Sequence, residues 1–131
     1  MENRDFSNYR ILIVDDSAHS RAQMRQILTE HNFTVVGEAA SAQEALALVK
    51  EKKPHLVLTD IVMPEASGIE LAEKIFSNQM GAGVIMLSSL TQDQVVIDAI
   101  AAGAADFVAK PIQPLQLVES VMKFLQNLSK E

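Results

Sequence analysis

The sequence predicts an α/β fold, a doubly wound parallel sheet built from five strand–helix units, (βα)5. Five short runs of residues, at 11–14, 33–36, 56–58, 84–87 and 107–109, are apolar on both faces, as are parallel strands that helices cover on both sides. Apolar residues at helical spacing follow each run, at 24–28, 42–49, 71–76, 95–100 and 118–128. Because strand and helix alternate without a long polar gap, the helices must cover both faces of one sheet.

The length of the chain fits one domain with one core. The chain has 131 residues, of which 48% are hydrophobic, and this is enough apolar surface to build a core. We expect an N-terminal extension over residues 1–9 and a single domain over residues 10–129, with no linker. The strand starts are too unevenly spaced for a solenoid repeat.

The composition excludes several classes of function. Eleven Lys and Arg against 17 Asp and Glu give a net charge of -6, which would repel the phosphate backbone of a nucleic acid. The absence of cysteine excludes disulfides, thiolate nucleophiles and cysteine-ligated metal sites. The first ten residues lack the apolar core of a signal peptide, and no stretch approaches the roughly 20 apolar residues that span a bilayer. We therefore expect a cytoplasmic protein that binds neither nucleic acid nor membrane.

Acidic residues follow two strands that the fold should place side by side. The flavodoxin-like strand order 2-1-3-4-5 makes strands 1 and 3 neighbours, with their carboxyl ends facing a crevice. Asp15 and Asp16 follow the first strand, and Asp60 follows the third. Two like charges about 4 Å apart repel by roughly 1 kcal/mol in water and about 4 kcal/mol at an effective dielectric of about 20, so a cation should offset them. Mg2+ fits best, because it takes oxygen ligands from carboxylates, water and a phosphate.

The same edge of the sheet should also carry a hydroxyl and an amine. Ser88 ends the fourth strand and Lys110 ends the fifth, and with a metal ion they would surround a phosphoryl group. Each residue taken alone also has a simpler interpretation. The two acids after strand 1 would cap the following helix, the acid after strand 3 would be a solvated loop residue, and the serine would satisfy a loop backbone group.

Taken together, these motifs match a known family. The matching segments are Val14-Asp15-Asp16-Ser17, Leu58-Thr59-Asp60-Ile61-Val62-Met63-Pro64 with Ser67-Gly68, Met86-Leu87-Ser88-Ser89, Ala102-Gly103-Ala104 and Asp106-Phe107-Val108-Ala109-Lys110-Pro111. In order and spacing they resemble the receiver domains of two-component response regulators, most nearly the stand-alone chemotaxis (CheY-like) type. The resemblance covers residue 10 to about residue 128, nearly the whole chain.

The resemblance implies a phosphoryl acceptor and a metal site. Asp60 matches the carboxylate that takes a phosphoryl group from the phosphohistidine of a sensor histidine kinase. Asp16 resembles the direct Mg2+ ligand, and Asp15 resembles the acid that holds the metal through water. Asp60 itself and the backbone carbonyl of Val62 complete the implied ligand set.

The resemblance also implies a switch. Ser88 matches the switch hydroxyl and Lys110 the amine that pairs with the phosphate. Phe107 falls at the switch aromatic position, although a core aromatic in strand 5 would need no special role. The bond between Lys110 and Pro111 is usually cis in this family.

Two positions differ from the family members that lose their phosphoryl group fastest. Val62 stands two residues beyond the acceptor and Leu90 two beyond the switch serine, where family members can carry polar side chains. These apolar residues leave the core chemistry intact. They bear on the rate of self-dephosphorylation.

The resulting hypothesis is a phosphorylation-dependent signalling switch, not an enzyme acting on external substrates. Phosphorylation would change the surface of helix 4, strand 5 and helix 5, which then binds a partner such as a flagellar-motor protein. Alternatives are a phosphorelay intermediate that serves a phosphotransfer protein, or a receiver cut from a longer regulator. A further alternative is a Mg2+-dependent phosphatase with an aspartyl-phosphate intermediate, but enzymes of the haloacid dehalogenase type carry a second Asp two residues after the acceptor, where Val62 and Ser17 stand. A flavodoxin would need a loop rich in Ser, Thr and Gly after strand 1.

The histidines have no part in this hypothesis. His19, His31 and His55 are 12 and 24 positions apart, which is not a metal-ligand spacing. We expect all three to be surface residues.

Overall fold

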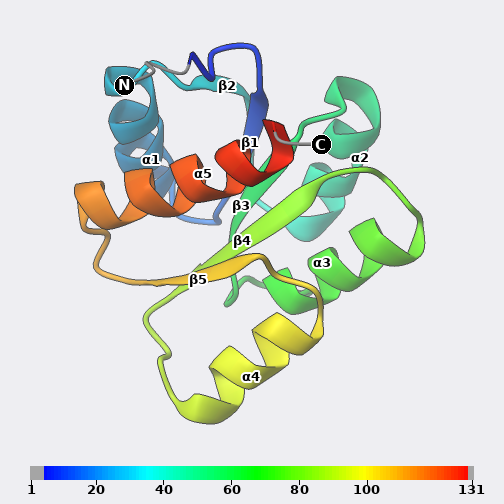
Figure 1. The fold of residues 1–131 in the computed structure, drawn as a ribbon. Coiled ribbons are helices and arrows are strands. Elements are labelled where there is room, and N and C mark those ends of the chain that lie inside the picture. Colours follow the sequence, from blue (N-terminus) through cyan, green and yellow to red (C-terminus); the bar gives the residue numbers. More distant parts are fainter. Residues whose placement is uncertain (1–4, 130–131) are drawn as a thin grey trace.

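The computed structural model describes residues 5–129, and within them a five-stranded parallel sheet alternates with five helices (Figure 1). The strand order is β2-β1-β3-β4-β5, which confirms the order expected from the sequence. The strands are β1 (Arg10–Val14), β2 (Thr34–Ala39), β3 (Leu56–Asp60), β4 (Gly83–Ser88) and β5 (Asp106–Ala109). The helices are α1 (Ala18–Glu30), α2 (Ala42–Lys52), α3 (Gly68–Ser77), α4 (Asp93–Ala101) and α5 (Pro114–Ser129).

The helices form two layers, one on each face of the sheet. Helices α1 and α5 cover one face, and α2, α3 and α4 cover the other (Figure 1). Each layer closes its own apolar core. Met24 of α1 and Val121 of α5 lie in one core, and Val49 of α2 and Leu71 of α3 lie in the other.

The expectation that every strand is buried on both faces is wrong for the two edge strands. Strands β1, β3 and β4 are almost fully buried, whereas most residues of β2 and half of those of β5 are half-buried. An edge strand has a neighbour on one side only, so helices cover it less completely. Strand β2 also runs beyond the apolar residues at 33–36 and includes Gly37 and Glu38.

The extension expected over residues 1–9 lies partly outside the described residues, because description begins at residue 5. The described part packs on the domain. Phe6 is buried in the core beside α1 and α5, and its ring centroid is 6.0 Å from that of Tyr9. Thr34 donates a hydrogen bond of 2.6 Å from Oγ1 to the carbonyl of Ser7.

One histidine differs from expectation. His55 is half-buried: its Nδ1 accepts a hydrogen bond of 2.9 Å from the amide of Arg10, and its ring lies edge-on to Tyr9. Burial, with a smaller contribution from the nearby Arg10 charge, lowers the pKa of His55. The other two histidines are exposed, as expected.

A glycine sets the distance between β3 and α3. A Cβ built on Gly68 would lie 2.3 Å from the carbonyl oxygen of Asp60, so any side chain there would push the helix away from the strand. The Gly68 amide donates a 2.9 Å hydrogen bond to the carbonyl of Ile61, and Ser67 and Glu70 form a capping box. The start of α3 therefore holds the end of β3, where Asp60 lies.

Across the described residues, none of the helices combines the length and apolar character needed to cross a membrane.

Candidate functional site

The acids that follow β1 and β3 lie together at the carboxyl edge of the sheet. In the parallel pairing of these strands Val14 stands opposite Thr59, so Asp15 and Asp60 come one residue later on neighbouring strands. One carboxylate oxygen from each of Asp15, Asp16 and Asp60 lies within 4.8 Å of the other two. The predicted convergence of three carboxylates is confirmed.

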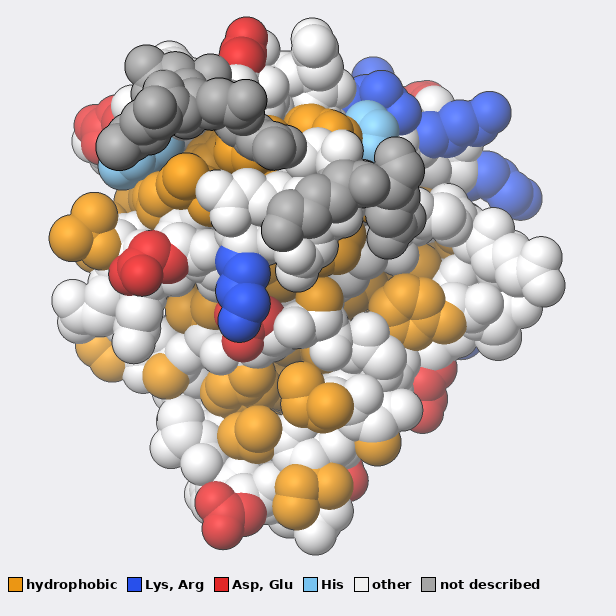
Figure 2. Space-filling model, in the orientation of Figure 1, with side chains coloured by type: hydrophobic (Ala, Val, Ile, Leu, Met, Phe, Trp, Pro, Cys, Tyr) orange, Lys and Arg blue, Asp and Glu red, His pale blue; other side chains and the backbone are white. Residues whose placement is uncertain are grey.

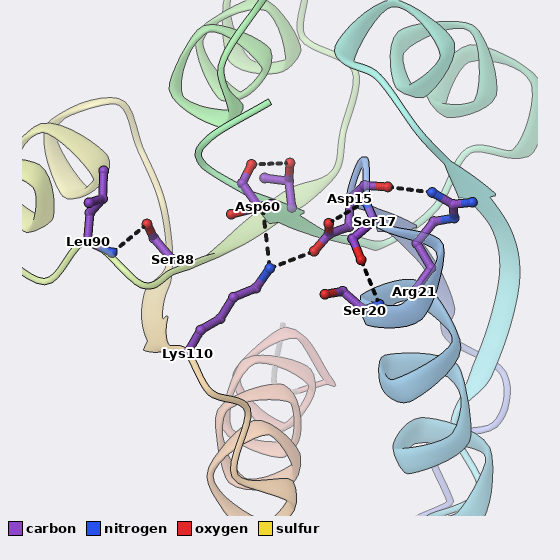
Figure 3. A network of polar contacts seen from close by, with 9 residues as sticks. Asp15, Ser17, Ser20, Arg21, Asp60, Ser88, Leu90 and Lys110 are labelled. Carbon is purple, nitrogen blue, oxygen red and sulfur yellow. Dashed lines mark hydrogen bonds and ion pairs between the residues drawn. The ribbon is translucent and has the colours of Figure 1, made fainter. Parts of the chain in front are cut away.

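A lysine that follows the edge strand β5 contacts two of these acids. Lys110 follows β5, and its Nζ lies 2.8 Å from Oδ2 of Asp15 and 3.3 Å from Oδ2 of Asp60 (Figure 3). The side chain of Asp15 is fully buried, and those of Asp60 and Lys110 are only 12% and 18% exposed. The amine thus bridges two carboxylates largely out of contact with water.

Asp15 is held on several sides. Its amide donates to the carbonyl of Ala39 at 3.0 Å, and its Oδ1 accepts from the amide of Ser17 at 2.9 Å. Ser17 is itself the N-cap of α1, because its Oγ accepts from the amide of Ser20 at 3.2 Å. The simpler interpretation that Asp15 and Asp16 cap the helix is therefore wrong, because Ser17 is the N-cap and the Oδ1 of Asp15 accepts from the amide of that residue. Asp16 is exposed.

The electrostatics of the site disfavour its empty, ionised form. Burial raises the pKa of Asp60 first of all and Asp15 raises it further, and together they outweigh Lys110 and a hydrogen bond from the backbone of Val62. Burial alone would lower the pKa of Lys110, but Asp15 and Asp60 raise it above the usual range for lysine. The lysine therefore stays protonated, and its one positive charge is outnumbered by the three carboxylates of the cluster.

These residues fit a hard divalent cation. The cluster offers only carboxylate oxygens, which Mg2+ prefers, and its excess negative charge is what a cation would offset. Asp16 is exposed and open to such an ion. The carbonyl of Val62 remains a predicted ligand.

Within the described residues, no hydrogen bond joins the hydroxyl of the expected switch to the acids. Ser88 is fully buried, and its Oγ accepts a 3.0 Å hydrogen bond from the amide of Leu90, pointing away from Asp60 (Figure 3). Phe107 is half-buried and packs against the core beneath α2, α3 and α4. The Lys110–Pro111 bond is cis, as predicted. Val62 and Leu90 are 55% and 40% exposed.

The sequence reasoning missed one contact with the acid loop. Arg21 of α1 donates from Nη1 to the carbonyl of Asp15 at 2.7 Å (Figure 3). Arg21 lies one helical turn beyond the N-cap Ser17, a position from which a long side chain can reach back to the preceding loop. That spacing was the available signal.

The chain is similar to known proteins over most of its length. Residues 11–122 match the response regulator receiver domain family. The chemotaxis protein CheY of Thermotoga maritima is 43% identical over 114 residues, 87% of this chain and 95% of that protein. CheY of Bacillus subtilis is 44% identical over 117 residues, 89% of this chain and 98% of that protein.

Solved structures give the same result. A chain in the crystal structure of the CheX–CheY–BeF3–Mg2+ complex from Borrelia burgdorferi is 34% identical, with a TM-score of 0.85 over 89% of each chain. Receiver domains bind Mg2+ in an acidic pocket, work with a kinase and a downstream target, and are signalling proteins, not enzymes in the usual sense. The chain belongs to the response regulator receiver domain family, and it is a phosphorylation-dependent signalling switch of the two-component type.

Proposed function

We propose that Asp60 accepts the phosphoryl group from the phosphohistidine of a sensor histidine kinase. Mg2+ would be held by Asp15, Asp16, Asp60 and the backbone carbonyl of Val62. The observation that carries the proposal is the cluster itself, with three carboxylates within 4.8 Å and the amine of Lys110 against two of them.

The chemistry needs no general base from the protein. An ionised Oδ of Asp60 attacks phosphorus and forms a P–O bond, while the P–N bond to the kinase histidine breaks and its electron pair returns to the imidazole. Bound Mg2+ would neutralise charge on the phosphoryl oxygens. Lys110 is suited to pair with one of these oxygens, because its raised pKa keeps it protonated. The only reactions we assign to the chain are its own phosphorylation and dephosphorylation.

The proposal is tested by labelling with a small-molecule donor. Acetyl phosphate and Mg2+ should add the mass of one phosphoryl group to the intact protein, and EDTA should prevent the addition. Labelling that persists in EDTA would overturn the metal requirement. No labelling in Mg2+ would overturn the proposed function.

We further propose that the switch serves chemotaxis and acts on a flagellar-motor protein or a related partner. The support is the likeness to curated CheY proteins and to a chain from a CheX–CheY complex.

Figure 2 shows hydrophobic side chains gathered over α4 and the strip between α4 and α5. The most exposed large apolar residues of these helices are Ile97, Ile100 and Leu115, which are 57%, 49% and 70% exposed. Capture of a motor protein only in the presence of beryllium fluoride and Mg2+, which mimic the acyl phosphate, would support this assignment. Capture independent of activation would contradict it.

Ser88→Ala should uncouple phosphorylation from partner binding. To reach a phosphoryl group on Asp60, the Ser88 hydroxyl must leave the amide of Leu90, and this exchange would move the loop before α4. The alanine variant should still be labelled, though more slowly. It should bind its partner about tenfold more weakly when phosphorylated, the value of about one hydrogen bond. The measurement is the partner Kd of each phosphorylated protein.

The neighbouring Ser89 supplies the control, because it is exposed. Ser89→Ala should bind the partner like the wild type. Equal affinity of phosphorylated wild type and Ser88→Ala would refute the coupling.

The phosphoryl group on Asp60 should be long-lived compared with receivers that carry polar residues at both neighbouring positions. Hydrolysis needs a water in line with phosphorus, and neither Val62 nor Leu90 can hold one by a hydrogen bond. Val62→Asn combined with Leu90→Glu should speed decay about tenfold, equivalent to about 1.4 kcal/mol of barrier. The measurement is the decay of phosphoprotein after the donor is removed.

Ile97→Glu is the matched control, since Ile97 is equally exposed but lies on α4. It should leave the decay rate unchanged. A double variant that decays no faster than the wild type would show that water access past these two residues does not limit the signal.

A further inference from the structure

The loop that carries Asp15 and Asp16 is tied to the edge strand β2 through an arginine of α1. Arg21 donates from Nη1 to the carbonyl of Asp15 at 2.7 Å and from Nε to Oε1 of Glu38 at 3.2 Å. The other oxygen of Glu38 accepts from Arg25. Figure 3 shows the Arg21 side chain reaching up from α1 to the Asp15 backbone.

This contact is built more firmly than an ordinary surface ion pair. The side chain of Arg21 is only 19% exposed, compared with 43% for Arg25. The hydrogen bond from Arg25 lowers the pKa of Glu38 most, and the charge of Arg25 and the hydrogen bond and charge of Arg21 lower it further. These effects outweigh the partial burial of Glu38, so its carboxylate stays ionised. Because a guanidinium is planar, two acceptors on different elements fix its orientation.

The Asp15 carbonyl matters because it belongs to the peptide that joins Asp15 to Asp16. That unit is planar, so a hydrogen bond to its oxygen also sets the direction in which the chain enters Asp16. Asp15 has its own restraints, from Ser17 and Lys110. Within residues 5–129 the structure records no hydrogen bond to the carboxylate of Asp16, which is exposed.

We propose that Arg21 is a positioning residue for the metal site. Oriented by Glu38, it holds the Asp15–Asp16 peptide so that the Asp16 carboxylate is already directed toward the cation, and it thereby raises Mg2+ affinity. This inference rests on the metal site of the proposed function.

Charge and position predict opposite effects when Arg21 is replaced. A cationic guanidinium repels Mg2+, so the loss of its charge alone would strengthen metal binding. The loss of its hydrogen bond to the Asp15 carbonyl would free the peptide and weaken metal binding. The direction of the change therefore separates the two effects.

The test is Mg2+ binding without any phosphodonor, followed through the backbone amide signals of Asp16 and Ser17 by NMR titration. Arg21→Gln should raise the Mg2+ Kd about tenfold, the value of about one hydrogen bond. Arg25→Gln is the matched control, because it also removes one positive charge and one contact with Glu38 but has no recorded contact with Asp15. It should bind Mg2+ as the wild type does, or slightly more tightly.

A second variant keeps the inference testable if Arg21→Gln fails to fold. Glu38→Gln removes the charge that orients Arg21 while leaving the arginine in place, and it should weaken Mg2+ binding by a smaller factor. Its loss of negative charge alone would also weaken binding, so the comparison is with Glu44→Gln, an exposed acid on α2.

The outcomes distinguish a failure of the positioning role of Arg21 from a failure of the metal site itself. Unaltered or tighter Mg2+ binding by Arg21→Gln would overturn the positioning role, as would equal weakening in Arg25→Gln. If Glu38→Gln raises the Mg2+ Kd no more than Glu44→Gln does, the positioning role is likewise overturned. Absence of Mg2+ binding in the wild type would instead refute the metal site of the proposed function.

Discussion

Asp60→Asn is expected to abolish labelling by acetyl phosphate and Mg2+. The amide has nearly the shape of the carboxylate but is a poor nucleophile, so the acceptor is lost while the surroundings are kept. The measurement is the intact mass of the protein after incubation with the donor. Asp98→Asn, an exposed acid on α4, is the control and should be labelled normally. Labelling of Asp60→Asn at the wild-type level would falsify the assignment.

The same variant should make the metal-free protein more stable. The folded-state pKa of Asp60 is raised, so its protonated form contributes stability below the unfolded-state pKa, and that stability is lost as pH rises through the folded-state pKa. The asparagine stays neutral, so its advantage over the wild type should be near zero in acid and reach on the order of 1 kcal/mol at neutral pH. Urea unfolding in EDTA at acidic and neutral pH measures this difference.

Mg2+ should reverse the order. A cation that binds only the folded wild type stabilises it by about 2.7 kcal/mol at a hundred times its Kd, whereas the asparagine variant has lost one ligand. An asparagine variant less stable than the wild type in EDTA at neutral pH would show that Asp60 is not under electrostatic strain.

Lys110→Met should have the largest effect on metal-free stability. Removal of the amine leaves the buried carboxylates of Asp15 and Asp60 facing each other without a cation. Breaking a fully buried pair costs about 3–5 kcal/mol, and we expect about 2–3 kcal/mol here because water still reaches part of the lysine. Saturating Mg2+ should recover part of the loss. The measurement is urea unfolding in EDTA and in Mg2+.

Lys123→Met is the control for Lys110→Met. Lys123 is exposed on α5, and its replacement should change the free energy of unfolding by less than about 0.5 kcal/mol. A loss of the same size in both lysine variants would show that the ion pair with Asp15 and Asp60 does not stabilise the fold.

Sequence reasoning predicted the strand order and the acid cluster for the same physical reason. Alternating apolar segments define a parallel sheet, and in such a sheet residues that follow different strands share one edge. Asp15, Asp60 and Lys110 could therefore be placed together, although Lys110 is 95 positions from Asp15 and 50 positions from Asp60 in the sequence.

What escaped prediction depends on contacts that no local pattern encodes. The direction of the Ser88 hydroxyl is set by one amide, that of Leu90. The partner of Arg21 is a residue of β2 beyond the apolar stretch that marked the strand. His55 is half-buried because Arg10, at the start of β1, lies beside it. The pairing of β1 with β3 creates this contact, and no pattern near His55 in the sequence indicates it.

The ion pair of Lys110 has a consequence for the order in which the sheet assembles. The acid that follows β1 comes 95 residues before the amine that follows β5. A nascent chain that has paired β1 with β3 but lacks β5 would hold the acids together with no cation between them. Pairing of β5 with β4 brings in Lys110 and removes that repulsion. The ion pair therefore stabilises the complete five-stranded sheet relative to forms that lack β5.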